Sequence, residues 1–181
     1  MRKAKHLYRI EFGGLESGLH HFSFDLEDAF FAIFENSDIL HGKLKAEVDF
    51  EKNTSLLALT IRIAGFVNVV CDRCLDEFDM KTEYEGRLFF RFGDGMYEEQ
   101  SDNVFLIPRT ESMLDMSQHF YEGIMLSMPI RKVHPENDNG ESTCNREMID
   151  KIRDYSREKE AEEDNFDIRW NELKKIKNGT S

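Results

Sequence analysis

Cys71 and Cys74 form a Cys-x-x-Cys pair, the arrangement in this sequence that most clearly points to chemistry. At this spacing a tight turn can direct two thiolates at one tetrahedral zinc ion, and the same spacing also occurs in redox pairs. A redox pair usually opens a helix, whose N-terminus stabilises the thiolate. Here the residues after Cys74 return to the alternation typical of a strand. The sequence therefore favours a metal knuckle between two strands over a redox pair.

A tetrahedral site needs two further ligands. The third cysteine, Cys144, lies far beyond the pair, and His134 is the histidine nearest to it. If the helix expected before Pro129 folds back over a sheet, both residues can reach the knuckle. The predicted zinc ligands are then Cys71, Cys74, His134 and Cys144. Structural thiols without a metal stay an alternative, because the second pair lacks compact spacing, and a solvent-exposed loop position stays an alternative for His134.

Four protein ligands would leave zinc no open position for an activated water, so the expected role is structural. The sequence has no phosphate-binding glycine loop, no nucleophile elbow and no zinc-hydrolase helix pair. The other histidines have no carboxylate or nucleophile pattern near them in sequence and are expected at the surface or at sheet edges: His6, His20, His21, His41 and His119. We therefore predict no catalytic residues and no enzymatic activity.

The composition limits the compartment and the partners. Of the 181 residues, 40% are hydrophobic and 33% charged, which excludes a disordered chain. The longest apolar run covers residues 29–34, whereas a membrane span needs about 20 such residues. Few cysteines, two of them closely paired, are typical of a reducing cytoplasm. The net charge of −12 disfavours an extended phosphate-binding face.

Alternating patterns predict the elements that hold the knuckle. Apolar residues alternate with charged ones over residues 43–51 and 78–92, the latter being one long strand or two joined near Gly86. In the return strand at residues 57–63, every second residue is a large apolar one expected to point inward. A first strand is expected at residues 7–12, and Gly65 is expected to mark a bulge. Asp25 is expected to cap a short helix with Phe30, Ile33 and Phe34 on its buried side, and Asp115 to cap a helix ending before Pro129. The cluster of Phe30, Phe31 and Phe34 is expected to pack in the core.

These elements predict an α+β fold: an antiparallel β-sheet core with a few helices packed on it and a C-terminal helical segment. Residues 1–155 are expected to form a single α+β domain that contains the Cys-x-x-Cys knuckle. Within them, residues 145–155 are expected to be helical. Residues 156–181 are expected to form a charged linker, or solvated helix, and a short amphipathic helix around Trp170.

Several short motifs occur together in a specific order. They are Cys-Asp-Arg-Cys-Leu at residues 71–75, Leu-Ser-Met-Pro at 126–129 followed by Val133 and His134, then Cys144, and Asp-Ile-Arg-Trp at 167–170 with Leu173 beyond. In order and separation they resemble the YceD family of large-ribosomal-RNA accumulation proteins, over roughly residues 44–176. The second half-site of that family is often a richer cysteine cluster that resembles a zinc ribbon.

The resemblance implies a non-enzymatic cytoplasmic ribosome biogenesis factor, needed for accumulation or processing of large-subunit ribosomal RNA. The implied partner is a large-subunit ribosomal protein or a pre-ribosomal particle, with possible contact to the RNA and none to a membrane. An acidic surface suits a small basic protein. Two other classes stay open: a thiol-disulfide enzyme using Cys71 and Cys74, and direct RNA binding through basic patches at residues 2–9 and 174–177.

Overall fold

A computed structural model describes residues 7–35, 37–39, 41–93, 98–101 and 103–162. The chain divides into two compact units, Met1–His134 and Pro135–Ser181. The first unit contains, in chain order, β1 (Arg9–Glu11), β2 (Gly18–Leu26), α1 (Asp28–Phe31), β3 (His41–Lys52), β4 (Leu56–Val70), β5 (Glu77–Gly93), β6 (Glu98–Ser101), β7 (Val104–Pro108), β8 (Met113–Asp115) and α2 (Ser117–Ser127). The second contains α3 (Arg146–Glu162).

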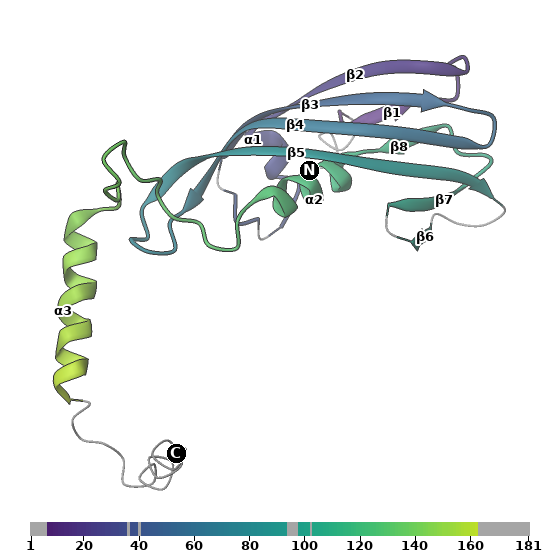
Figure 1. Ribbon diagram of the computed structural model, residues 1–181. Helices are drawn as coiled ribbons and strands as arrows, with labels where there is room; N and C mark the ends of the chain where they lie inside the picture. The colour runs from purple at the N-terminus through teal and green to yellow at the C-terminus, as the bar shows by residue number, and fades with distance from the viewer. Residues whose placement is uncertain (1–6, 36, 40, 94–97, 102, 163–181) are drawn as a thin grey trace, which may run out of the picture. The chain divides into compact units, whose positions relative to one another are not determined.

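A six-stranded sheet with the order β2-β3-β4-β5-β7-β6 forms the frame of the first unit (Figure 1). The four long strands β2 to β5 are antiparallel neighbours, and β7 joins β5 in parallel. Along β3 the side chains of Leu44, Ala46, Val48 and Phe50 are buried, whereas those between them reach the solvent. This confirms the predicted antiparallel sheet with one solvated face.

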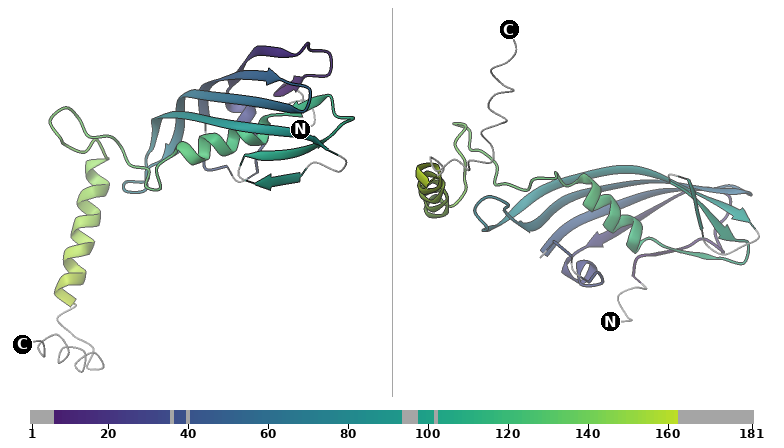
Figure 2. Two further views of the ribbon diagram at one scale, coloured as in Figure 1. Left: turned by 45° about the vertical axis from the view of Figure 1, so that its right-hand side comes forward. Right: turned by 90° about the horizontal axis from the view of Figure 1, so that it is seen from below.

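The other face of the sheet is covered by α2 and by the two-stranded sheet β1-β8. Figure 2 shows α2 lying along the long strands, and β5 is its main contact. Phe120 and Ile124 of α2 are fully buried, as is Ile10, whose cross-strand partner is the buried Leu114. The apolar core therefore lies between the six-stranded sheet and these covering elements, which confirms the α+β fold class.

Helix α1 contributes aromatic side chains to this core. Phe30 and Phe31 are buried, and Phe34, just beyond the helix, packs against the same cluster, as predicted. The predicted cap was wrong, because Asp25 belongs to β2 and pairs with Lys45 of β3. The alternation that begins in β2 simply continues through Asp25, so the helix starts three residues later, at Asp28.

Strand β4 runs without interruption past Gly65, so the predicted bulge was wrong. Gly65 has φ +154°, which side chains rarely allow, and it lies opposite Leu44 of β3. A Cβ atom at Gly65 would lie 2.6 Å from the Leu44 Cα atom and would also collide with the Lys43 carbonyl oxygen. The glycine is thus required for close approach of two backbones rather than for an extra residue.

The segment between β5 and α2 contains three strands that the sequence patterns did not reveal. β7 is five residues long and buries Phe105 and Ile107, while β6 and β8 are shorter still. Runs this short carry too little alternation to be recognised. For residues 78–92 the structure selects one of the two predicted options, since β5 is a single strand from Glu77 to Gly93.

In the second unit, α3 begins after Asn145, whose side-chain oxygen accepts a hydrogen bond of 3.0 Å from the Glu147 backbone N–H. The expected helix at residues 145–155 is confirmed, and it continues into the charged stretch as far as Glu162. The predicted amphipathic segment around Trp170 lies outside the described residues. The domain division at residue 155 stays a prediction. No helix in the described part of the chain is long and apolar enough to span a membrane.

His119 of α2 lies in the core and not at the surface, where the sequence placed it. Its side chain is only 9% exposed, and its ring packs edge-on against Phe90 and Phe105 at centroid distances of 5.8 and 4.9 Å. Burial lowers the pKa of His119 below its ordinary value, because desolvation disfavours the charged imidazolium. The folded protein therefore holds this side chain neutral at pH values at which an exposed histidine is protonated.

This burial predicts that the protein loses stability as the pH falls below about 6.5. As the pH falls, His119 is protonated in the unfolded chain before it is protonated in the folded protein. Its contribution to the free energy of unfolding is therefore complete above about pH 6.5 and declines below it. The free energy of urea unfolding should decrease from pH 7.5 to pH 5, and His119→Phe should show a smaller decrease. The pKa values of Asp28 and Asp49 are lowered from 3.8, so these two carboxyl groups affect stability only at more acidic pH. Equal slopes for wild type and variant would contradict this prediction.

Candidate metal centre

The Cys-x-x-Cys pair lies in the connection between β4 and β5, as predicted. The turn is closed by two backbone hydrogen bonds, from the Cys71 N–H to the Asp76 carbonyl at 2.9 Å and from the Leu75 N–H to the Cys71 carbonyl at 3.0 Å. Leu75 has φ +64°, in the left-handed region that side chains seldom occupy. Both cysteines are fully buried. A tight turn thus directs two thiols into the protein and not toward solvent.

Asp72 ties a second segment to this turn. Its backbone N–H donates to the Lys132 carbonyl at 2.7 Å, and one of its carboxylate oxygens accepts from the Lys132 backbone N–H at 2.6 Å. In Figure 1 the chain leaving α2 passes the β4-β5 turn at one end of the sheet. His134 follows two residues later, with its Nδ1 atom 3.4 Å from the Cys74 sulfur. The ring of Phe78 stacks on the His134 imidazole at 4.6 Å.

Within the second unit the chain turns back on itself shortly after His134. The Thr143 hydroxyl donates to the Pro135 carbonyl at 2.7 Å, and Glu136 bridges to Ser142. This loop brings Cys144 back next to the start of the segment. The ligand atoms of Cys71, Cys74 and His134, all in the first unit, lie within 4.8 Å of one another. Cys144, the fourth predicted ligand, belongs to the second unit, and its place in the set stays a prediction.

The geometry and the donor types fit a zinc ion. With Zn–S bonds of about 2.3 Å and Zn–N bonds of about 2.0–2.1 Å, neighbouring ligand atoms of a tetrahedral site lie roughly 3.5–3.8 Å apart. The distance of 3.4 Å between the Cys74 sulfur and His134 Nδ1 is close to this range. Three thiols and one imidazole are soft and borderline donors that suit zinc. The cluster could therefore hold a metal with ligands from the protein alone.

The surroundings of Cys71 favour its thiolate. Burial by itself would raise the pKa of Cys71, but backbone N–H groups of Cys74 and Arg73 and contacts to His134 outweigh this effect and lower the pKa to about 6. The Arg73 N–H lies 3.4 Å from the Cys71 sulfur. A thiolate is the form that ligates metals, so Cys71 is largely ready to bind at neutral pH. The N–H donors come from a turn between strands rather than from a helix N-terminus.

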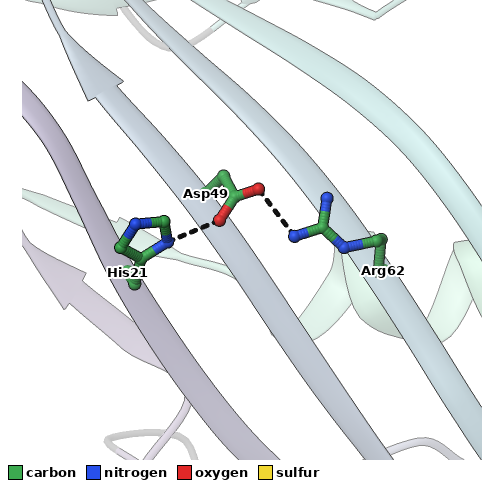
Figure 3. Close-up of polar contacts among 3 residues, drawn as sticks. All are labelled: His21, Asp49 and Arg62. Carbon is green, nitrogen blue, oxygen red and sulfur yellow. Dashed lines mark hydrogen bonds and ion pairs between the residues drawn. The ribbon is translucent and has the colours of Figure 1, made fainter.

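Two histidines have carboxylate partners that sequence spacing did not reveal. His21 of β2 bonds to Asp49 of β3 at 2.6 Å, and Arg62 of β4 donates to the other oxygen of Asp49, also at 2.6 Å (Figure 3). His41 similarly bonds to Asp28 at 3.1 Å. The partners are 13 to 28 positions apart. Strand pairing brings His21 and Asp49 together, whereas His41 meets Asp28 because α1 lies against β3. The His21 side chain is 70% exposed, which agrees with the surface position expected for it.

Comparison with known protein families identifies the family of this chain. A family model described as "Large ribosomal RNA subunit accumulation protein YceD" matches residues 59–177. The chain belongs to the YceD family. The match to this family begins within β4 and includes the Cys-x-x-Cys turn, His134 and Cys144. The family description refers to accumulation of the large ribosomal RNA subunit and names no reaction. No curated protein and no solved structure matches the chain.

Proposed function

We propose that the protein is a non-enzymatic ribosome biogenesis factor of the cytoplasm, needed for accumulation or processing of large-subunit ribosomal RNA. It acts by binding a large-subunit ribosomal protein or a pre-ribosomal particle. Membership of the YceD family over residues 59–177 carries this proposal. The net charge of −12 supports it, because an acidic surface accelerates the encounter with a basic ribosomal protein and discourages acidic competitors.

We further propose that Cys71, Cys74, His134 and Cys144 bind a structural zinc ion. When bound, zinc would supply a four-coordinate cross-link with no open position for water. The protein residues around it support a structural role: Asp72 joins the turn to the segment that carries His134, and Phe78 orients the imidazole ring. The expected effect is a fixed surface at this end of the sheet, available for a partner.

A depletion experiment tests the biogenesis role. Cells that lack the protein should accumulate less large-subunit ribosomal RNA relative to small-subunit RNA, and the wild-type gene should restore the ratio. Tagged protein should sediment with precursors of the large subunit in a sucrose gradient. The small-subunit RNA serves as an internal control. An unchanged ratio, together with tagged protein found only in the unbound fractions, would reject the proposed role.

A thiol-disulfide enzyme is the second candidate, because two buried thiols lie in one turn and Cys71 accepts a backbone N–H bond. The candidate requires Cys71→Ser to abolish thiol-disulfide exchange while leaving fold and metal content unchanged. The structural proposal requires the opposite, namely a change in metal content and stability with no exchange activity in the wild type. One set of measurements on this variant thus separates the two candidates.

A further inference from the structure

The solvent-facing side of β5 changes character along its length. In its first half, acids and bases alternate: Lys81 pairs with Glu83 at 2.6 Å, and Glu85 lies opposite Arg62 of β4. In its second half the outward positions are Arg87, Phe89 and Arg91, with no acid among them. The sheet face therefore has one section in which charges balance and one in which positive charge is in excess.

Arg87 and Arg91 differ from three other bases on this face. Lys45, Arg62 and Lys81 each pair with a carboxylate, and Figure 3 shows this for Arg62. Within the ranges that the structure describes, neither Arg87 nor Arg91 makes an ion pair or a side-chain hydrogen bond. Opposite them on β4 lie Thr60 and Leu56, which carry no charge. Both guanidinium groups are exposed and available to an anion.

Phe89 lies between the two arginines and outside the core. Its cross-strand neighbours are Ala58 of β4 and Val104 of β7, both smaller than the ring. Phe89 is half-buried, and its ring packs against no other aromatic ring among the described residues. An aromatic ring beside small neighbours on a sheet face offers a flat surface on which a planar group can stack.

A hollow adjoins this ring. It has a volume of about 480 Å³ and is lined by Ser55, Leu56, Phe89, Arg91, Phe92 and Val104. The acid opposite Ala58 is Glu51 of β3, two strands away from Phe89, which corresponds to roughly 10 Å at ordinary strand spacing. The Asp49 carboxylate is held by Arg62 and His21. Between Phe89 and β3 the surface is therefore locally positive within an acidic protein.

We propose that Arg87, Phe89 and Arg91 form a binding site for single-stranded RNA. This inference rests on the proposed function and identifies the RNA of the precursor particle as a contact. An unpaired base stacks on Phe89, and the arginines neutralise neighbouring phosphates. Two unpartnered arginines repel a basic ribosomal protein, so this face suits RNA better than that partner. A single ring on a sheet selects unpaired bases, because bases in a duplex are already stacked.

Fluorescence anisotropy with a short, labelled single-stranded RNA tests the site. Phe89→Leu keeps an apolar side chain but removes the π face, and it should raise the Kd by roughly 5- to 150-fold. Arg91→Gln should make the slope of log K against log salt shallower by about 0.7, the effect of one phosphate contact on a single strand. Lys81→Gln is the matched control, since it removes a charge from the same face of the same strand. It should leave the Kd within about twofold, because Lys81 is already paired with Glu83.

The inference would be overturned if the wild type bound no RNA. It would also be overturned if wild type and Phe89→Leu had equal Kd values at unchanged melting temperature, or if a labelled acidic peptide bound more tightly than RNA. Complementation separates this failure from failure of the proposed function. If the wild-type gene restores large-subunit RNA and the Phe89→Leu gene does so equally well, the RNA site is wrong and the biogenesis role stands. If the wild-type gene restores nothing, the biogenesis role itself is wrong.

Discussion

Replacing Cys74 with serine is expected to empty the proposed zinc site and to lower the free energy of unfolding by several kcal/mol. Cys74 is fully buried, its sulfur lies 3.4 Å from His134 Nδ1, and a serine hydroxyl is a poor zinc ligand. A bound structural metal adds its binding free energy to the stability of the fold, and this amounts to roughly 10–16 kcal/mol in zinc-finger peptides. The loss should be smaller here, because a large apolar core remains. Metal analysis and urea unfolding of the purified protein measure both effects.

Two further variants sharpen this test. Cys144→Ser should also reduce the zinc content, and retention of one zinc per chain in that variant would exclude the four-residue ligand set. His41→Asn is the matched control, because His41 is exposed, bonds to Asp28 and does not belong to the cluster. Its zinc content and stability should equal those of the wild type.

Treatment with a chelator distinguishes a metal centre from structural thiols. If zinc is bound, wild-type protein stripped of metal should melt like Cys74→Ser and should recover when zinc is added. If the wild type contains no metal and a chelator leaves its melting temperature unchanged, the thiols are structural and act through packing alone. Such a result would leave the family membership intact.

Replacing Gly65 with alanine is expected to destabilise the protein by roughly 2–6 kcal/mol. The new Cβ would lie 2.6 Å from the Leu44 Cα atom and against the Lys43 carbonyl, both of them backbone atoms of β3 that cannot rotate away. The φ angle of +154° adds strain for any side chain. Backbone strain of about 1–3 kcal/mol and overpacking of about 1–3 kcal/mol together give this range. Chemical denaturation should show the change as a lower midpoint.

Gly14→Ala provides the matched control for this prediction. A Cβ atom at Gly14 would meet nothing within 4 Å, so the substitution should change the free energy of unfolding by no more than about 0.5 kcal/mol. Equal midpoints for the two variants would show that β3 and β4 can separate locally without cost. The close approach at Gly65 would then not be required for the fold.

Periodicity predicted the main strands because it reports burial directly. Leu44, Ala46, Val48 and Phe50 occupy every second position, and only a strand with one buried face places them together. The same reasoning failed for β7, whose five residues pair with β5 in parallel. A strand that short is stabilised by its neighbour, and the identity of that neighbour is not contained in its own pattern.

In the candidate sites, too, the sequence predicted features set by neighbouring residues but not contacts between residues far apart in the chain. The spacing of Cys71 and Cys74 predicted a turn with two thiols, since that geometry depends on four adjacent residues. The outward run of Arg87, Phe89 and Arg91 also belongs to the sequence. That the two arginines lie beside uncharged residues, whereas Arg62 meets Asp49, depends on the register of three strands.

The sequence by itself determined the strand faces, the pair of thiols, the acidic balance and the resemblance to the YceD family, because each depends only on residue types and their order along the chain. Only the tertiary structure decided that His134 comes within 3.4 Å of Cys74. That approach depends on the Asp72–Lys132 hydrogen bonds, which bridge 60 positions of sequence and largely use backbone groups. Backbone groups are common to nearly all residue types, so such pairing leaves almost no signature in the sequence.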